Sequence, residues 1–281
     1  MPRGFRRKDE SEENRAVRTR APMRRLPAGE ENGVNRFFAD RSRIHDGIVT
    51  VTGGDVNHIR NVLRMHPGEK VLISCGDEWE YTCEILPYDS ADQVHLKIVD
   101  AQKPGRELPG RIYLFQCLPK SDKMDLIVQK AVELGAFAVV PVSSKRSIVR
   151  LDGKKAEAKV RRWNAVAESA AKQSKRMIVP EVFPVCTMEE AFALADREEI
   201  GDRLIPYECA ENMDGTRRRL CEIRRGSRIA VLIGPEGGFD SQEIREASEH
   251  GFSVITLGRR ILRTETAGMT MLSILMYLLD S

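Results

Sequence analysis

Alternation of apolar and polar residues marks the first part of the chain as β structure. It is clearest in two stretches, whose apolar members are Trp79, Tyr81, Cys83 and Ile85, and then Val94, Leu96 and Ile98. Strands with one buried face show this period of two. The stretch 55–65 instead carries apolar residues at helical spacing, namely Val56, Ile59, Val62 and Leu63. Residues 34–103 are therefore predicted to form a small, mostly antiparallel barrel or sandwich with one helical patch.

From residue 111 onwards, apolar runs alternate with helical periodicity. The pattern predicts strands at 111–118, 137–142, near 203–207, 228–233 and 252–257, and helices at 122–134, 154–174, near 215–224, 241–250 and 265–279. Two helix starts are well marked, one by Asp122 and one by Asp240 with Glu243 at capping-box spacing. Strands that alternate with helices indicate a parallel α/β sheet over 111–281.

Charge separates the N-terminus from the rest of the chain. Residues 1–33 hold nine of the 45 Lys and Arg and six of the 42 Asp and Glu, so the remainder, with 36 of each sign, is neutral. We expect 1–33 to be a disordered charged arm, either a solvated tail or an RNA-contacting segment. Residues 104–110, within KPGRELPG, are the expected linker. A neutral folded part binds nucleic acid only through local basic patches.

Several classes of protein are disfavoured. The six cysteines form no C-x-x-C pair and no zinc-spaced cluster with histidine, so we expect free thiols, a cytoplasmic location and no metal site. The longest apolar stretch, 269–279, is too short to span a bilayer. GRELPGR at 105–111 lacks the Lys and Ser/Thr of a P-loop. No G-x-G-x-x-G follows the first strand of the α/β part, which disfavours an ordinary dinucleotide site.

Two glycine-marked loops carry the strongest chemical signal. GPEGG at 234–238 follows one predicted strand, and Gly258 opens a second loop after the next strand. Ligands of open α/β sheets sit at the carboxyl ends of strands. Glycines there allow backbone N–H and C=O groups to approach a flat ligand such as adenine. A turn followed by a helix cap explains GPEGG alone, but the pair of loops indicates a binding site.

LIGPEGG at 232–238 together with LGRRILRTETA at 257–267 resembles the ribosomal RNA small subunit methyltransferase E family of the SPOUT superfamily. Further matches are KSDKMDLIVQKAVELGAFAVVPV at 120–142, RW with AAKQSKRMIVPEV within 162–182, NRFFAD at 35–40 and HIRNVLRM at 58–65. The resemblance covers about 34–281. It implies a PUA-like RNA-binding barrel over 34–103 and a methyltransferase domain over 111–281 whose parallel sheet is tied in a deep trefoil knot.

The resemblance also implies an activity. The protein would be a homodimer that uses S-adenosyl-L-methionine to methylate N3 of a uridine in 16S ribosomal RNA on the small subunit. The cofactor would lie against the two loops, at Leu232, Ile233, Gly234, Pro235, Glu236, Gly237, Gly238, Leu257, Gly258, Ile261, Leu262, Arg263, Thr264 and Ala267. Two other readings stay open: a non-catalytic RNA-binding or ribosome-assembly protein, and methylation of a different RNA site.

The chemistry suggests roles for three side chains. Uridine N3 must lose its proton to become nucleophilic, and Glu265 and Glu236 are the nearest carboxylates in the sequence that could accept it. Both could instead be structural. The negative charge then spreads to the uracil oxygens, where Arg263 would stabilise it, unless that arginine holds a phosphate or the partner subunit.

RNA contacts are expected from basic side chains in both domains. Arg60 and Arg64 are predicted to share one helix face at i, i+4, and Lys120 and Lys123 to lie at the start of a helix whose dipole favours phosphate. The full set of expected RNA-binding residues is Arg36, Arg60, Arg64, Lys120, Lys123, Arg146 and Arg176.

Overall fold

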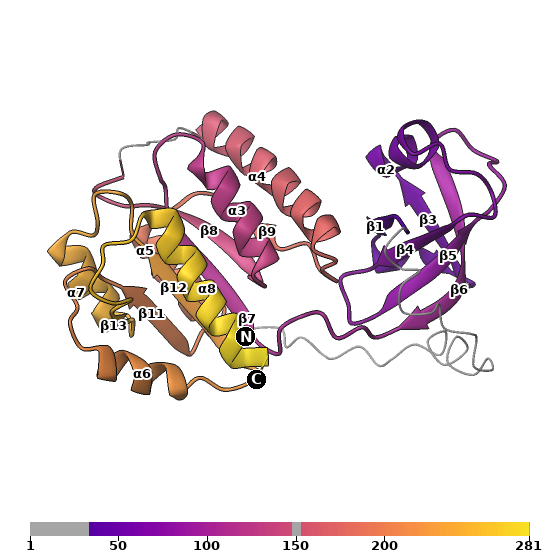
Figure 1. Cartoon of the computed structure of the whole chain (residues 1–281). Helices are drawn as coiled ribbons and strands as arrows, with labels where there is room; N and C mark the ends of the chain where they lie inside the picture. Colours follow the sequence, from indigo (N-terminus) through magenta and orange to yellow (C-terminus); the bar gives the residue numbers. More distant parts are fainter. Residues whose placement is uncertain (1–33, 148–152, 281) are drawn as a thin grey trace, which may run out of the picture. The chain divides into compact units, whose positions relative to one another are not determined.

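The computed structural model describes residues 34–147 and 153–280, which form two compact units divided after Gly105 (Figure 1). The predicted arm, 1–33, lies outside the described residues. The predicted linker, 104–110, lies at the division, and its residues 106–110 belong to the second unit. Within the described parts of the chain, no helix has the length and apolar character needed to cross a membrane.

The first unit is a curled six-stranded sheet of order β1-β4-β5-β6-β3-β2, antiparallel except where β1 pairs with β4. Its strands are β1 (Arg36–Phe38), β2 (Ile44–His45), β3 (Ile48–Thr52), β4 (Lys70–Ser74), β5 (Glu80–Ile85) and β6 (Gln93–Gln102), and a short 3₁₀ turn, η2 (Arg41–Arg43), precedes β2. Alternate side chains such as Val49, Ile73 and Leu96 are fully buried inside the curl. The predicted small antiparallel barrel is confirmed.

The helical patch of this unit is shorter than predicted. It consists of α2 (Gly54–Asn57) and a π-helical continuation, η3 (His58–Val62). The Leu63 N–H bonds to the carbonyl oxygen of His58, which closes the last turn, and Arg64 then takes a left-handed φ of 53°. Arg64 therefore lies outside the helix, and the prediction that it shares a helix face with Arg60 is wrong.

The second unit contains a seven-stranded sheet in which every pairing is parallel, so the predicted parallel α/β architecture is confirmed. The order is β10-β8-β7-β12-β11-β13, with β9 beside β8. The strands are β7 (Arg111–Cys117), β8 (Ala138–Ser143), β9 (Glu181–Val182), β10 (Cys186–Thr187), β11 (Asp202–Pro206), β12 (Arg228–Ile233) and β13 (Ser253–Ile255).

Helices cover both faces of this sheet, as buried parallel strands require (Figure 1). They are α3 (Lys123–Glu133), α4 (Gly153–Gln173), α5 (Met188–Arg197), α6 (Met213–Cys221), α7 (Ser241–Glu249) and α8 (Thr264–Asp280). Helices α5 and α7 share one core with the sheet, while α8 packs on β7 and β12 and against α3, which α4 covers. Sequence reasoning missed α5, although Thr187 and Glu190 form a full capping box at its start.

The path of the chain after β13 matters for the site. Strand β13 lies at one edge of the sheet, yet the next helix, α8, packs on the central strands β7 and β12. The segment 256–263 therefore returns from the edge towards the middle, across the carboxyl ends of the strands. This return is the segment that the predicted trefoil knot concerns. It brings the two glycine-marked loops together.

Candidate functional site

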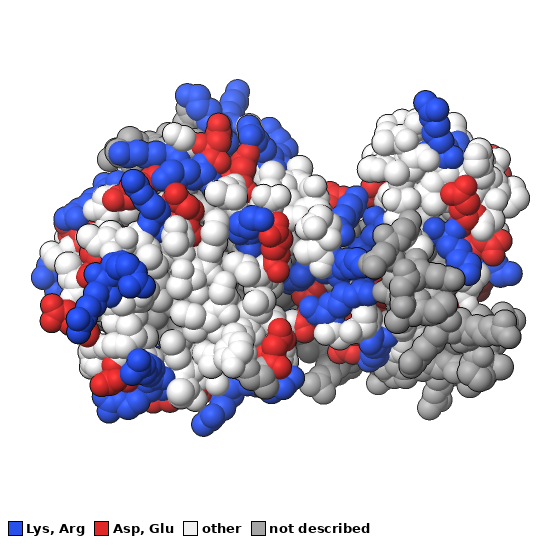
Figure 2. All heavy atoms as spheres, viewed as in Figure 1, with Lys and Arg blue, Asp and Glu red and all other residues white. Residues whose placement is uncertain are grey.

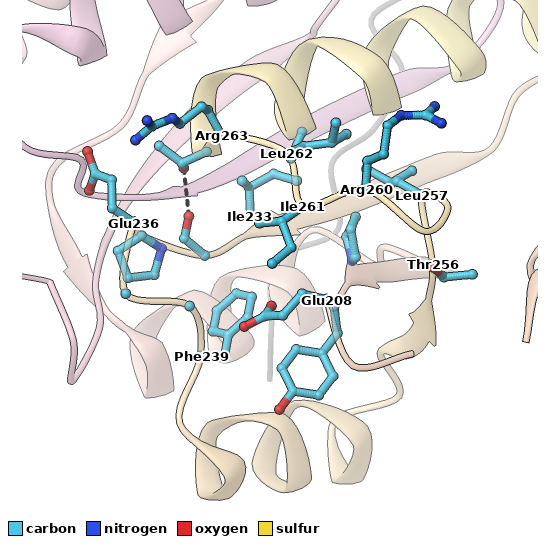
Figure 3. A pocket seen from close by; sticks show the side chains of 18 of the residues that line it. Glu208, Ile233, Glu236, Phe239, Thr256, Leu257, Arg260, Ile261, Leu262 and Arg263 are labelled. Carbon is cyan, nitrogen blue, oxygen red and sulfur yellow. Dashed lines mark hydrogen bonds between the residues drawn. The ribbon is translucent and has the colours of Figure 1, made fainter. Parts of the chain in front are cut away.

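The loops that follow β11, β12 and β13 and the first turn of α8 enclose a cavity of about 540 Å³ (Figure 3). All of the predicted cofactor residues except Leu232 line it, namely Ile233, Gly234, Pro235, Glu236, Gly237, Gly238, Leu257, Gly258, Ile261, Leu262, Arg263, Thr264 and Ala267. Leu232 is fully buried in the core between the sheet and α5 and α7, so its side chain lies away from the cavity.

Six lining residues were not predicted. Pro206 ends β11, Tyr207 and Glu208 follow it, and Phe239, Thr256 and Arg260 extend the two predicted loops. In the sheet β11 lies between β12 and β13, so its carboxyl end must face the same cavity. The strand near 203–207 was predicted, but its loop has no glycine and offered no local signal.

Glycine is needed at two places in this cavity. Gly238 has a φ of 66°, and a Cβ there would press against a carboxylate oxygen of Glu208. Gly258 has a φ of 108°, a conformation that L-residues rarely adopt. The expected role of the two loops, close approach of backbone to a ligand, is consistent with this geometry.

Thr264 ties the two loops together. Its hydroxyl donates to the carbonyl oxygen of Gly234 at 2.6 Å and accepts from the side-chain amide of Gln116 at 2.9 Å. Thr264 is 5% exposed and Gln116 is fully buried. The chain of bonds Gln116–Thr264–Gly234 therefore fixes the start of α8 against the end of β12, 30 residues earlier in the sequence.

The two candidate catalytic carboxylates meet at one ammonium group. The Lys123 Nζ lies 3.1 Å from Glu236 Oε1 and 3.3 Å from Glu265 Oε2. Glu236 also accepts the backbone N–H of Lys120, at 3.0 and 3.2 Å from its two oxygens. Glu236 lines the cavity and Glu265 does not. Lys123 was predicted to contact RNA, but the structure commits it to these carboxylates.

These contacts set the charge of the pair. Burial opposes ionisation of Glu236, but backbone N–H groups and Lys123 outweigh it and hold the pKa of Glu236 below its ordinary value. The hydrogen bond to Glu236 raises the pKa of Lys123, with a further contribution from Glu265. Both groups are therefore ionised at neutral pH, which makes Glu236 a weak proton acceptor and a strong anchor for its loop.

Arg263 lies at the mouth of the cavity, on the same side as Glu236 in Figure 3. Its side chain is exposed and forms no hydrogen bond or ion pair within the described part of the protein. An uncommitted guanidinium beside a cavity is suited to binding a negative charge. Glu208 on another loop and Arg260 complete the charged groups of the lining.

Two of the expected RNA-binding arginines are buried instead. Arg36 is paired with Glu80 and donates to Ser74 at 3.0 Å. Arg176, 5% exposed, holds Glu107 and donates to the carbonyl oxygens of Val132 and Ala136. Because both guanidiniums are saturated by internal acceptors, the prediction that they bind RNA is corrected: they are structural.

The other predicted RNA contacts differ in availability. Arg60 donates to backbone carbonyls at Ser90 and Gln93 and stacks 4.2 Å over the ring of Tyr88. Arg146 is exposed but holds the Gly237 carbonyl at 3.2 Å and Asp240 at 3.4 Å, so it braces the glycine loop. Arg64 and Lys120 are exposed, and their side chains make no ion pair among the described residues.

No group of three or more His, Cys, Asp or Glu suited to a metal ion occurs in residues 34–147 and 153–280.

Comparison with known protein families identifies the class of protein to which this fold and this cavity belong. Residues 106–276 match the family described as an RNA methyltransferase domain, and residues 51–99 match the RNA methyltransferase PUA domain. The chain therefore has the domain organisation of an RNA methyltransferase, with an N-terminal PUA-like unit.

Individual relatives narrow the class. The chain is 36% identical over 231 residues to ribosomal RNA small subunit methyltransferase E of Bacillus subtilis (strain 168), covering 81% of this chain and 89% of that one. It is 29% identical over 238 residues to the enzyme of the same name from Mesomycoplasma hyopneumoniae (strain 232), with 85% and 97% covered. A crystal structure of the Neisseria gonorrhoeae protein of that name, bound to S-adenosyl methionine, is 33% identical, covers 87% and 98%, and has a TM-score of 0.73. The chain belongs to the ribosomal RNA small subunit methyltransferase E family.

Proposed function

We propose that this chain transfers the methyl group of S-adenosyl-L-methionine to N3 of a uridine in 16S ribosomal RNA, uridine 1498 in the position given by the family. The observation that carries the proposal is the cavity between the glycine-marked loops, lined by the residues that the family resemblance selects. The relative from Neisseria gonorrhoeae, bound to S-adenosyl methionine, supports the choice of cofactor.

The cavity fits such a cofactor. Its volume of about 540 Å³ lies within the range of small-ligand sites. Ile233, Leu257 and Leu262 supply apolar walls, and the loops around Gly234 and Gly258 bring backbone groups to the same space. These are the elements that a flat, nitrogen-rich base requires. When bound, S-adenosyl-L-methionine supplies a methyl group on a sulfonium centre.

The protein groups then have separate tasks. Arg263 stabilises the negative charge that spreads over the uracil oxygens as N3 loses its proton. Glu236, held ionised by Lys120 and Lys123, positions the loop of GPEGG. Glu265, whose carboxylate lies 3.3 Å from the Lys123 ammonium, is the better candidate to accept the N3 proton, directly or through water.

RNA binding and assembly complete the proposal. The PUA-like domain, 34–103, would hold RNA with Arg64, and the methyltransferase domain, 111–281, with Lys120. Tyr277 on α8 is 74% exposed and Leu126 on α3 is 43% exposed, on helices that pack together. A second copy of the chain would cover them, which gives a homodimer. The protein would act in the cytoplasm, on the small subunit.

Calorimetry with S-adenosylhomocysteine and a labelled methyl-transfer assay on small subunits test the proposal in turn. We expect stoichiometric binding, and transfer that Arg263→Ala reduces about a hundredfold, since a single stabilising donor contributes at this level. If S-adenosylhomocysteine does not bind, the proposed enzyme activity is ruled out, and a non-catalytic RNA-binding protein becomes the better explanation. Binding with transfer to a nucleoside other than uridine would overturn the substrate alone.

A further inference from the structure

We infer that the N-terminal half of α4 binds the phosphate backbone of the substrate RNA. The surface in question, called here the basic ridge, consists of Lys154, Lys155 and Arg161. The inference rests on the proposed function, because it assigns part of the surface on which the RNA would lie. None of its three residues is among the RNA-binding residues expected from the sequence.

Charge is concentrated in one half of this helix. Residues 153–163 carry five basic residues and one acid, Glu157, whereas residues 164–173 carry one of each, Lys172 and Glu168. The folded part of the chain is neutral as a whole, so this excess is a local feature. Figure 2 shows Lys and Arg side chains gathered over the region where α4 begins.

Lys159 and Arg162 both have acidic partners at the start of α3. Lys159 pairs with Asp122 at 3.0 Å and Arg162 pairs with Asp125, so both hold α4 against the start of α3. Trp163, 3% exposed, anchors the next turn in the core. These contacts fix the orientation of the helix, and Lys154 and Arg161 lie on a different face from Lys159 and Arg162.

The basic ridge is exposed. Lys154, Lys155 and Arg161 are all exposed, and Glu157, at 3.9 Å from Arg161, is itself 72% exposed and weakly held. Lys154 and Arg161 are seven residues apart and share a helix face, about 10 Å apart along the axis. About three stacked nucleotides span that length. Exposed Ala158 lies between them, so no bulky side chain keeps a backbone away.

The helix dipole does not favour basic residues at this end. No acidic residue occupies the first turn of α4, and the positive end of the helix dipole repels Lys154 and Lys155. A polyanion across the ridge would remove that repulsion. RNA is such a polyanion, and a methyltransferase that acts on ribosomal RNA must bind it.

The ridge is also connected to the cavity. Asp122, which holds Lys159, directly precedes Lys123, and Lys123 binds Glu236 in the cavity lining. A strand of RNA that crosses the ridge would thus reach the start of α3, where Lys120 is exposed, and continue to the cavity mouth at Arg263.

A salt titration tests the inference. The full chain and the triple variant Lys154→Gln, Lys155→Gln, Arg161→Gln are titrated with small ribosomal subunits at several salt concentrations. The matched control is Arg217→Gln, Arg218→Gln, Arg224→Gln, which removes three exposed arginines at and just after α6, one of them likewise paired with a neighbouring acid at 3.2 Å. Binding of S-adenosylhomocysteine shows that each variant retains its cavity.

We expect the ridge variant to bind about tenfold more weakly at 0.1 M salt, with a slope of log K against log salt smaller by about two, while the control changes less than about twofold. Equal losses in both variants, an unchanged ridge variant, or no binding by the native chain would overturn the inference. A native chain that binds through the ridge but transfers no methyl group would refute the proposed function alone. Normal transfer and binding by the ridge variant would refute only the ridge.

Discussion

The ammonium nitrogen of Lys123 lies 3.1 Å from a carboxylate oxygen of Glu236. The same nitrogen lies 3.3 Å from Glu265, so one side chain of α3 holds both the loop after β12 and the first turn of α8. These are the two segments between which the cavity lies. The position of the candidate catalytic groups therefore depends on a residue that does not line the cavity itself.

Removing this ammonium group is expected to affect catalysis more than stability. Lys123→Gln should lower the methyl-transfer rate about tenfold, because two carboxylates would then face each other without a cation. The free energy of unfolding should change little, as for other partly exposed pairs. Lys130→Gln breaks a pair with Glu133 on the same helix, at 2.7 Å, and serves as the control. Equal rates in the two variants would refute the assigned role.

The pair also predicts a pH dependence of stability. The pKa of Glu236 is lowered from 4.5 in the folded protein, so its stabilisation is present above pH 4.5 and is lost as the pH falls through the folded value. The pKa of Lys123 is raised from 10.5, so its contribution is complete below that pH and is lost as the pH rises through the folded value. Urea unfolding of the native chain and Glu236→Gln should differ by a constant amount between these limits and converge in acid. A difference that grows towards low pH would contradict the assignment.

Gly238 should be essential for ligand binding because of its backbone conformation. Gly238→Ala puts a Cβ at a φ of 66° and against Glu208, at a cost of about 1–2 kcal/mol in unfolding free energy. Affinity for S-adenosylhomocysteine should fall as well. Gly226→Ala is the control, since Gly226 has a φ of 87°, open space around it and no place in the cavity lining. It should lose comparable stability and keep full affinity.

The structural role of Arg176 can be tested by measuring stability and RNA binding separately. Arg176→Met leaves Glu107 without its cation and two backbone carbonyls without their donor, so we expect a loss of about 3–5 kcal/mol in unfolding free energy. The folded fraction should bind small subunits with the native salt slope. A reduced slope with unchanged stability would restore the original view of Arg176 as an RNA contact.

Thr264 should link stability to cofactor affinity. Thr264→Val keeps the shape but removes the hydroxyl between Gln116 and Gly234, which leaves buried polar groups unpaired at a cost of about 1–3 kcal/mol. Thr264→Ser keeps the hydroxyl and should retain most of the affinity for S-adenosylhomocysteine. If Thr264→Val keeps its affinity and Thr264→Ser loses it, the methyl group and not the hydrogen bonds positions the loops.

The sequence predicted the parts of the fold that have a clear period. Parallel strands β7, β8 and β12 are continuous apolar runs, and the capping box of α7, at Asp240 and Glu243, marked its start. The sequence did not reveal where the helix predicted at 55–65 ends. The end is set by a π-helical turn and by the left-handed backbone conformation of Arg64, and neither has a periodic sequence signal. Short strands β9 and β10, two residues each, are too brief for any periodicity.

The site shows the same division. Local motifs selected the two loops, since glycine, proline and threonine reflect backbone needs that are visible in one stretch of sequence. Glu208 was missed because it reaches the cavity only through the order of strands in the sheet. Arg36 and Arg176 were misassigned because a basic residue looks the same in the sequence whether its partner is RNA or a buried glutamate such as Glu80 or Glu107.

The most direct test of the account is the identity of the methylated nucleoside. Purified chain, methyl-labelled S-adenosyl-L-methionine and small ribosomal subunits from a strain that lacks this gene are incubated together, and the digested RNA is analysed by mass spectrometry. We expect labelled 3-methyluridine from 16S ribosomal RNA. Label in any other nucleoside, or no label from a chain that binds S-adenosylhomocysteine and the subunits, would contradict it.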